Sequence, residues 1–406
     1  MPTSPDSSAQ SRRAFLRNAA IAAAGLTAAP LLAQQKVQLP FANGERELVR
    51  YPQKRPLIRL TTRPPQLETP FSVFNEGVVT PNDAFFVRYH LAGVPTSIDT
   101  SSFRINIKGS VNKPFSLTLD DLRKFDGKKV IAVLQCSGNS RGFSNPRVGG
   151  GQSANGAMGN AQWTGVPLKA VLEKAGLGAK AKQVTFGGID GPVLPATPDF
   201  AKALDLDHAL DGEVMIGYEM NGKPLPVLNG FPVRLIVPGY YGTYWVKHLN
   251  EITVIDDVLN NFWMNPAYRI PDNECACVPP GTTPTSTTPI KRYDVRSFIT
   301  SLHDGSKIQS GRKVPLKGIA FDGGTGIREV AVSVNDGPWQ TAKLGQDLGK
   351  YSFREWHLQW KPEKAGNYIL KVRATSKAGE TQPAEPRWNP AGYMRNVIET
   401  TKVTVV

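Results

Sequence analysis

A single cysteine stands where an apolar stretch gives way to a polar loop. Cys136 follows the apolar run VIAVL, residues 130–134, and precedes SGNS, residues 137–140. This pattern predicts a strand buried on both faces that ends at the thiol, and ligands bind at the strand ends of open sheets. With no second cysteine at metal-ligand spacing, the thiolate suits a metal whose other ligands come from a cofactor. The alternative is a buried and inert cysteine, which is the commoner state of a free thiol.

The stretch FFVRYH, residues 85–90, offers a candidate anion site. Its apolar start predicts a short strand, and the two-residue alternation places Arg88 and His90 on one side and Tyr89 on the other. An edge strand with a solvated charged face is the alternative. Farther along the chain, Arg234 and Lys247 fall at strand and loop positions where a buried cation needs an anionic partner.

Short helices and strands must position these groups. Thr118 with two aspartates after it predicts a helix over residues 118–125, and Pro167 with an apolar face that stops at Gly176 predicts a second one. Five glycines between residues 149 and 159 predict a loop that lets the backbone approach something bulky, with plain coil as the alternative. The class expected for the chain is α+β, with a mixed α/β domain over residues 34–278.

The pattern changes after residue 278. Residues 279–289, PPGTTPTSTTP, are rich in proline and threonine and are expected to form a linker. Residues 290–406 contain short alternating runs separated by glycine-containing turns, which predicts an all-β, immunoglobulin-like sandwich. No catalytic cluster is visible there, so interdomain packing or dimerisation is its expected role.

Residues 1–33 are expected to be an export signal and not part of the fold. SRRAFLR, residues 11–17, is a twin-arginine motif, and the apolar run over residues 18–32 is short and flanked as in a signal peptide, with cleavage expected after Ala33. A membrane span is not expected from so short a run. Because the twin-arginine route carries folded proteins, it predicts a periplasmic protein with a bound cofactor.

The chain has a net charge of +14, of which the leader contributes +2 through Arg12, Arg13, Arg17 and Asp6, so +12 remains on the expected mature protein. A basic surface favours anions or acidic partners. Nucleic acid is excluded as the partner because the basic residues are dispersed and form no Lys/Arg-rich block.

The other two of the three cysteines, Cys275 and Cys277, are too few for a disulfide scaffold. Their C-x-C spacing is awkward for a disulfide, and it lacks the C-x-x-C-H pattern of haem attachment. The two residues are therefore expected to be structural or weakly paired.

Several motifs together resemble the sulfite oxidase family of molybdenum enzymes, and most nearly its bacterial exported sulfite dehydrogenases. They are FFVRYH, LQCSGNSR, YEMNGKPLP followed by GFPVR, PGYYGTYWVKHL and FWMNPAYRIP, with the β-sandwich after them. The resemblance covers nearly the whole mature chain. It implies a pyranopterin dithiolene (molybdopterin) that binds molybdenum through two sulfurs, with Cys136 as the protein ligand of the metal.

The resemblance also implies roles for individual residues. The catalytic candidates are Arg88 as the first choice for binding sulfite, Tyr268 near the oxygen ligand of the metal, Cys136, and Arg141 and Arg395 as further residues of the anion pocket. The cofactor-binding candidates are Phe86, Val87, Arg88, Tyr89, His90, Cys136, Asp190, Asn229, Arg234, Trp245, Val246 and Lys247. Asn229, Thr243 and Tyr244 depart from the vertebrate pattern, which has histidine at the first position and Ala-Arg at the other two.

The implied reaction is oxidation of sulfite to sulfate by oxygen-atom transfer. No haem or flavin domain is recognisable in this sequence, so the expected electron acceptor is a separate c-type cytochrome. A transient partner and a permanent subunit are the two forms that this cytochrome could take. The expected assembly is a homodimer or a heterodimer. The alternatives are a sulfane dehydrogenase of the thiosulfate-oxidising system, a reductase of the same fold, and a cofactor-free binding protein in which Cys136 is inert.

Overall fold

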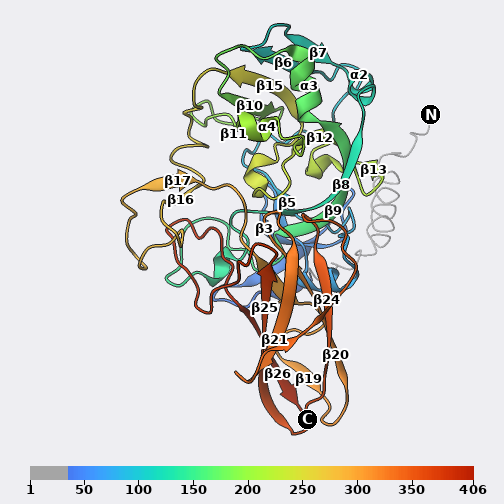
Figure 1. The fold of residues 1–406 in the computed structure, drawn as a ribbon, viewed down its shortest axis with the longest axis vertical. Coiled ribbons are helices and arrows are strands. Elements are labelled where there is room, and N and C mark those ends of the chain that lie inside the picture. Colours follow the sequence, from blue (N-terminus) through green and yellow to red (C-terminus); the bar gives the residue numbers. More distant parts are fainter. Residues whose placement is uncertain (1–34) are drawn as a thin grey trace, which may run out of the picture.

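The computed structural model describes residues 35–406, and the export signal expected over residues 1–33 lies outside the described residues. Strands make up most of the regular structure (Figure 1). Three sheets build the part that contains Cys136, and two further sheets build an elongated sandwich at the C-terminal end.

The first sheet fixes the backbone of the FFVRYH stretch. Its strands are antiparallel and lie in the order β1 (Lys36–Gln38), β2 (Glu45–Val49), β3 (Leu57–Thr61), β4 (Gln66–Glu68) and β5 (Val87–Arg88). The predicted strand is therefore only two residues long. Because Arg88 pairs with Gln66 on β4, the start of its side chain has a fixed position.

The third sheet delivers Cys136. It has the order β13 (Lys223–Pro224), β12 (Met215–Met220), β9 (Met158–Pro167) and β8 (Lys128–Gln135), and β14 (Arg234–Ile236) also pairs with β12. β8 ends directly before Cys136, which confirms the predicted strand end. Burial on both faces was wrong for the first half of β8, because Val130 and Ile131 are half-buried and full burial begins at Ala132.

The second sheet covers the other side of the site. Its order is β11 (Ala201–Asp205), β10 (Gln183–Gly188), β15 (Leu249–Ile255), β6 (Ile105–Gly109) and β7 (Phe115–Leu117), with β15 and β6 parallel and the other neighbours antiparallel. β15 follows the segment that carries Lys247, and β11 lies at the sheet edge with Lys202 as its second residue.

Helices are few and short. The α-helices are α2 (Leu119–Arg123), α3 (Leu168–Ala175) and α4 (Leu206–Ala209), and the 3-10 helices are η1 (Phe71–Asn75), η2 (Arg141–Phe143), η3 (Val227–Asn229) and η4 (Gly242–Tyr244). The two predicted helices are confirmed: Thr118 caps α2 in a capping box, and Gly176 ends α3. The expectation of a mixed α/β domain overstated the helix content. Nowhere in residues 35–406 is a helix long and apolar enough to cross a membrane.

The C-terminal part is a pair of sheets. One has the order β18 (Arg296–Ile299), β20 (Val314–Phe321), β24 (Arg354–Trp360) and β23 (Lys343–Leu344). The other has the order β19 (Ser306–Ile308), β26 (Glu399–Val405), β25 (Gly366–Ser376), β21 (Ile327–Val334) and β22 (Gln340–Thr341). A separate pair, β16 (Arg269–Pro271) and β17 (Thr287–Pro289), joins the segment after Tyr268 to the end of residues 279–289.

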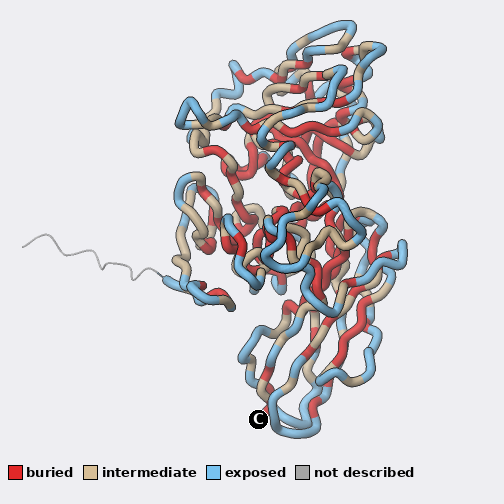
Figure 2. Tube along the Cα trace, turned by 90° about the vertical axis from the view of Figure 1, so that its left-hand side faces the viewer, coloured by how far each residue is buried: buried red, intermediate tan, exposed pale blue. Residues whose placement is uncertain are grey.

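The near end of the sandwich packs into the core that surrounds the site. Buried residues continue from one part into the other (Figure 2), and Phe298 and Phe353 belong to the same apolar cluster as Leu134. The backbone N–H of Val133 on β8 donates to the Tyr351 carbonyl at 2.9 Å. The sandwich therefore helps to fix the strand that ends at Cys136.

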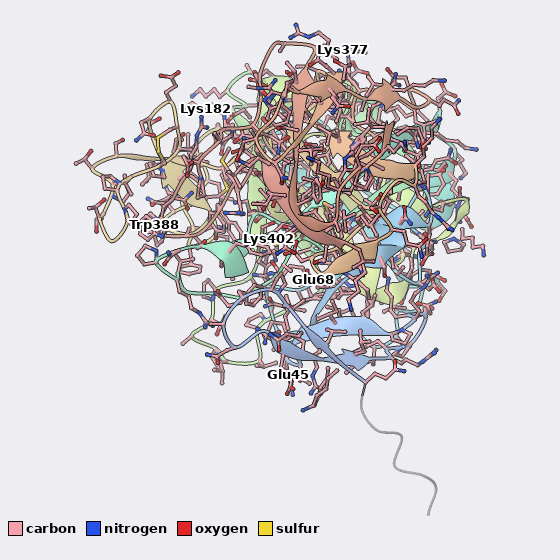
Figure 3. All side chains as sticks on the ribbon, turned by 90° about the horizontal axis from the view of Figure 1, so that it is seen from below. Glu45, Glu68, Lys182, Lys377, Trp388 and Lys402 are labelled. Carbon is pink, nitrogen blue, oxygen red and sulfur yellow. A yellow bond between two sulfur atoms is a disulfide. The ribbon has the colours of Figure 1, made fainter. Side chains whose placement is uncertain are left out.

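Cys275 and Cys277 form a disulfide despite their spacing. Ala276 between them has a left-handed φ of +50°, and the two cysteine Cα atoms lie 5.1 Å apart. The N–H of Val278, next to this disulfide, donates to the carbonyl of Trp388 at 2.9 Å. Trp388 is labelled in Figure 3, which draws a disulfide as a yellow bond. Of the two expectations for these cysteines, structural or weakly paired, the disulfide agrees with the structural one, and the left-handed residue makes it possible by turning the chain back on itself.

Candidate active site

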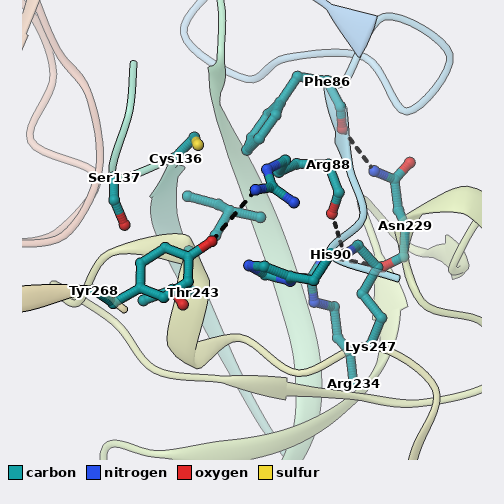
Figure 4. A pocket seen from close by; sticks show the side chains of 12 residues that line it. Phe86, Arg88, His90, Cys136, Ser137, Asn229, Arg234, Thr243, Lys247 and Tyr268 are labelled. Carbon is teal, nitrogen blue, oxygen red and sulfur yellow. Dashed lines mark hydrogen bonds between the residues drawn. The ribbon is translucent and has the colours of Figure 1, made fainter. Parts of the chain in front are cut away.

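A cavity that is partly open to solvent lies at the end of β8 (Figure 4). Side chains from the first and third sheets meet there with side chains from loops, including the segment that leads into β15 of the second sheet. The lining residues are Phe86, Arg88, His90, Leu134, Cys136, Ser137, Asn229, Arg234, Gly242, Thr243, Lys247 and Tyr268. Eight of them are residues predicted from the sequence.

Hydrogen bonds hold the loop that presents Cys136. The Cys136 N–H donates to the Ala157 carbonyl at 2.9 Å, and the Cys136 carbonyl accepts from the N–H of Asn139 at 3.0 Å. Ser140 has a left-handed φ of +70°, and its hydroxyl accepts from the buried guanidinium of Arg296 at 3.0 Å. Because Arg296 belongs to β18, the C-terminal sandwich contributes to the position of the thiol.

The predicted alternation in FFVRYH is confirmed by the cavity. Arg88 and His90 both line it, whereas Tyr89 points away and its hydroxyl lies 2.7 Å from His248 Nε2. The Arg88 guanidinium donates to the Tyr268 hydroxyl at 3.3 Å, and the Arg88 carbonyl accepts from Lys247. These contacts direct the guanidinium toward the Cys136 side of the cavity.

Cations gather in this cavity without carboxylate partners. Among residues 35–406, neither Arg88, Arg234 nor Lys247 forms an ion pair. Burial lowers the pKa of Lys247 to about 7 and that of Arg234 to about 9. Burial and the surrounding positive charges also hold the pKa of His90 well below its usual value, so His90 is neutral. Such a group of desolvated cations is costly unless an anion binds among them.

Arg234 is held at the floor of the cavity. Its two terminal nitrogens donate to the carbonyls of Asn229 and Trp245, each at 2.9 Å, and its guanidinium lies 5.4 Å from the Trp163 ring centre. Its Nε is buried and has no hydrogen-bond partner within the described chain. Asn229 donates in turn to the Phe86 carbonyl at 3.0 Å, which links this floor to the FFVRYH stretch.

Tyr268 occupies a strained backbone position. It has a left-handed φ of +57°, which is costly for an aromatic residue, and it is buried. Its ring stacks on Tyr393, with ring centres 5.6 Å apart and an interplanar angle of 6°. Burial raises the pKa of Tyr268, so its hydroxyl stays protonated and can donate a hydrogen bond.

Arg141 lines a smaller second cavity, which shares Phe86, Arg88 and Cys136 with the first. Its guanidinium lies 5.0 Å from the Tyr393 ring centre, and its Nε donates to the Ala391 carbonyl at 2.9 Å. A Cβ on Gly150, whose φ is +98°, would come within 2.7 Å of this guanidinium. The predicted glycine loop therefore leaves room for Arg141.

Several predicted residues lie outside both cavities. Arg395 lines a separate cavity, with its guanidinium 5.2 Å from the Phe143 ring centre. Asp190, Trp245 and Val246 are buried behind the first cavity, and Tyr89 contacts His248. Trp245 reaches the site through Arg234, because its carbonyl accepts from the guanidinium and its ring centre lies 5.7 Å from that group.

Four lining residues were missed by the residue-by-residue predictions: Leu134, Ser137, Gly242 and Thr243. Leu134 and Ser137 flank Cys136, and Gly242 and Thr243 fall in the PGYYGTYWVKHL motif. Proximity to predicted residues in the sequence was the available signal. Tyr393, which stacks on Tyr268, had the same signal because it lies two residues before the predicted Arg395, whereas Lys202, which also reaches Tyr268, had none.

The residues present fit an anionic and polar cofactor. Ser137 Oγ, Thr243 Oγ1 and Arg234 Nε are buried and have no hydrogen-bond partner within the described chain. Buried polar groups normally have partners, so these atoms indicate a polar ligand. The cations suit a phosphate group, and the Cys136 thiol suits a soft metal.

Comparisons with known proteins point to one family. A family model described as "Oxidoreductase molybdopterin binding domain" matches residues 90–263, and one described as "Mo-co oxidoreductase dimerisation domain" matches residues 287–405. The mitochondrial sulfite oxidase of Rattus norvegicus is 33% identical over 374 residues, which cover 87% of this chain and 67% of that protein. The sulfite oxidase of Arabidopsis thaliana is 31% identical over 386 residues, covering 88% and 96%.

The mitochondrial sulfite oxidase of Homo sapiens is 33% identical, and the match covers 85% of this chain and 65% of that protein. The chain therefore spans about two thirds of the length of these mammalian relatives. Among solved structures, the sulfane dehydrogenase SoxCD from Paracoccus pantotrophus matches with a TM-score of 0.70 and 23% identity, over 90% of this chain and 87% of that one. This match describes the fold.

Proposed function

Because this chain belongs to the sulfite oxidase family of molybdenum enzymes, we propose that it oxidises sulfite to sulfate and passes the electrons to a separate c-type cytochrome. The observation that carries the proposal is the group of desolvated cations without carboxylate partners around the Cys136 thiol. A small oxyanion and an anionic cofactor both suit this surrounding.

In the proposed mechanism, Cys136 would hold the metal, and Arg234, Lys247, Asn229 and His90 would hold the organic part of the cofactor. Bound there, the molybdenum cofactor would supply oxygen-atom transfer and take up two electrons. The protein's part is to bind, orient and exclude water.

Arg88 binds the substrate anion in this proposal. The Arg88 guanidinium has permanent charge and fixed donor directions. The Tyr268 hydroxyl contacts this guanidinium, and Lys247 donates to the backbone carbonyl of Arg88. Tyr268 has a protonated hydroxyl at neutral pH, which can donate to an oxygen of the substrate or product. Arg141, in the adjoining cavity, adds positive charge close to the same place.

The proposal extends to the cell and the assembly. SRRAFLR, residues 11–17, supports export to the periplasm by the twin-arginine route. The two C-terminal sheets support an immunoglobulin-like domain that acts in dimerisation with a second copy or with a partner subunit.

A parallel substrate assay tests the proposed reaction. Purified protein expressed with cofactor supply should contain close to one molybdenum atom per chain and should reduce cytochrome c with sulfite faster than with thiosulfate or protein-bound sulfane sulfur. Preference for sulfane sulfur would reassign the enzyme to a sulfane dehydrogenase. Molybdenum far below one atom per chain would favour a cofactor-free binding protein.

The electron acceptor has its own test. The mature charge of +12 favours an acidic docking face on the cytochrome, so the bimolecular rate should fall as salt rises. Stopped-flow mixing of sulfite-reduced enzyme with acidic and basic c-type cytochromes at several ionic strengths measures this. A rate with the acidic cytochrome that does not change with salt would contradict electrostatic docking.

A further inference from the structure

Lys202 is a buried cation that the proposed mechanism does not use. It is the second residue of β11 and has 1% of its surface exposed. Its ammonium donates to the Trp263 carbonyl at 2.7 Å and lies 4.6 Å and 5.1 Å from the ring centres of Tyr244 and Tyr268. Within residues 35–406 it pairs with no carboxylate, and burial lowers its pKa to about 7.

The strand does not require this ammonium. β11 pairs with β10 through backbone atoms, and Lys202 stands opposite Phe186 there. An apolar side chain of similar length would fill the same space without the cost of desolvating a charge. The ammonium is therefore expected to have a role other than the formation of the sheet.

The contacts of Lys202 converge on the segment that ends at Tyr268. One contact holds the Trp263 carbonyl and another the ring of Tyr268, five residues later in the chain. Tyr268 needs such support because its left-handed backbone is costly for an aromatic residue. The hydroxyl that this backbone positions is the one that accepts from Arg88 at 3.3 Å.

We propose that Lys202 is a positioning residue for the oxidation of the substrate anion: its ammonium holds Tyr268 and the Trp263 carbonyl, and thereby keeps the Tyr268 hydroxyl against Arg88. A cation over an aromatic ring is attracted to the ring face, most strongly where water is excluded. Removing the ammonium leaves the tyrosine free to turn away from Arg88. This inference rests on the proposed sulfite oxidation only for its kinetic test.

A double-mutant cycle tests the proposal through Tyr268. At pH 6, where Lys202 is charged, Lys202→Met should lower kcat/KM for sulfite about tenfold, as expected for losing one desolvated cation–ring contact and one hydrogen bond. In a Tyr268→Phe background, which has no hydroxyl to position, Lys202→Met should cause little further loss. Lys291→Met is the matched control, because Lys291 pairs with Asp205 at the exposed end of the same strand.

Equal losses in both backgrounds, or an unchanged kcat/KM in the single variant, would overturn the proposal. If Lys202→Met lowered kcat/KM only by destabilising the fold, the loss in kcat/KM would be equal in the two backgrounds. If Lys202→Met does not fold, Lys202→Leu serves in the same cycle.

Sulfate binding separates this proposal from the proposed function. Calorimetric titration with sulfate should show weaker binding in Lys202→Met than in the wild type, and no such difference in the Tyr268→Phe background. If the wild type binds sulfate with this pattern but does not oxidise sulfite, the proposed function fails and the role of Lys202 stands. If it oxidises sulfite and sulfate affinity is the same in all variants, the role of Lys202 fails alone.

Discussion

The Cys136→Ser variant should lose its oxidation of sulfite by well over about 100-fold, because even the residues that only support metal ligands account for 10–100-fold in affinity or activity. Serine keeps the shape of the side chain but replaces a soft thiolate with a hard hydroxyl, which stays protonated at neutral pH. The fold should persist, since the loop is held by backbone contacts of Cys136 and by Asn139. Steady-state kinetics measures the loss of sulfite oxidation, metal analysis measures the molybdenum content, and thermal unfolding shows whether the fold persists.

The matched control is the double substitution Cys275→Ser, Cys277→Ser, which removes the other two cysteines of the chain. These two residues form a disulfide that lines neither cavity. The double variant should keep one molybdenum atom per chain. X-ray absorption of the wild type should show one more sulfur neighbour of molybdenum than that of Cys136→Ser. Identical metal–sulfur shells in the two proteins would remove Cys136 from the metal site.

Local sequence patterns predicted the elements that present the site. The apolar run before Cys136 predicted β8, the capping residue Thr118 predicted α2, and the alternation in FFVRYH placed Arg88 and His90 on one side. These features depend on neighbours within a few residues, for which periodicity and capping chemistry are informative. The roles of the site residues were inferred from resemblance to a family. The structure adds the position of each of these residues.

Long-range contacts were not predictable in the same way. Arg296 reaches Ser140, Tyr393 stacks on Tyr268, and Lys202 reaches the same ring, although these pairs are far apart in the chain. No periodicity reports such contacts, because they depend on how the sheets pack. The same limitation explains Arg395, whose charge fits an anion pocket but whose guanidinium lies over Phe143 in a different cavity.

The Arg88→Met variant should raise the sulfite concentration required for half-maximal rate by about tenfold to a hundredfold. A charge-assisted hydrogen bond to an anion contributes about 1.5 to 3 kcal/mol, and each 1.4 kcal/mol changes an affinity about tenfold. Methionine keeps much of the side-chain length and removes the charge. Because the Lys247 contact is made to the Arg88 carbonyl, it survives the substitution.

Arg55→Met is the matched control for this arginine, since Arg55 pairs with Asp83 and Glu76 at the surface and lines neither cavity. It should leave the sulfite requirement unchanged. Sulfate should also inhibit the two variants differently. Compared with the wild type, inhibition should be weaker in Arg88→Met and unchanged in Arg55→Met. An anion bound by Arg141 alone would leave both the sulfite requirement and the sulfate inhibition of Arg88→Met as in the wild type, and that result would move the substrate from the first cavity to the second.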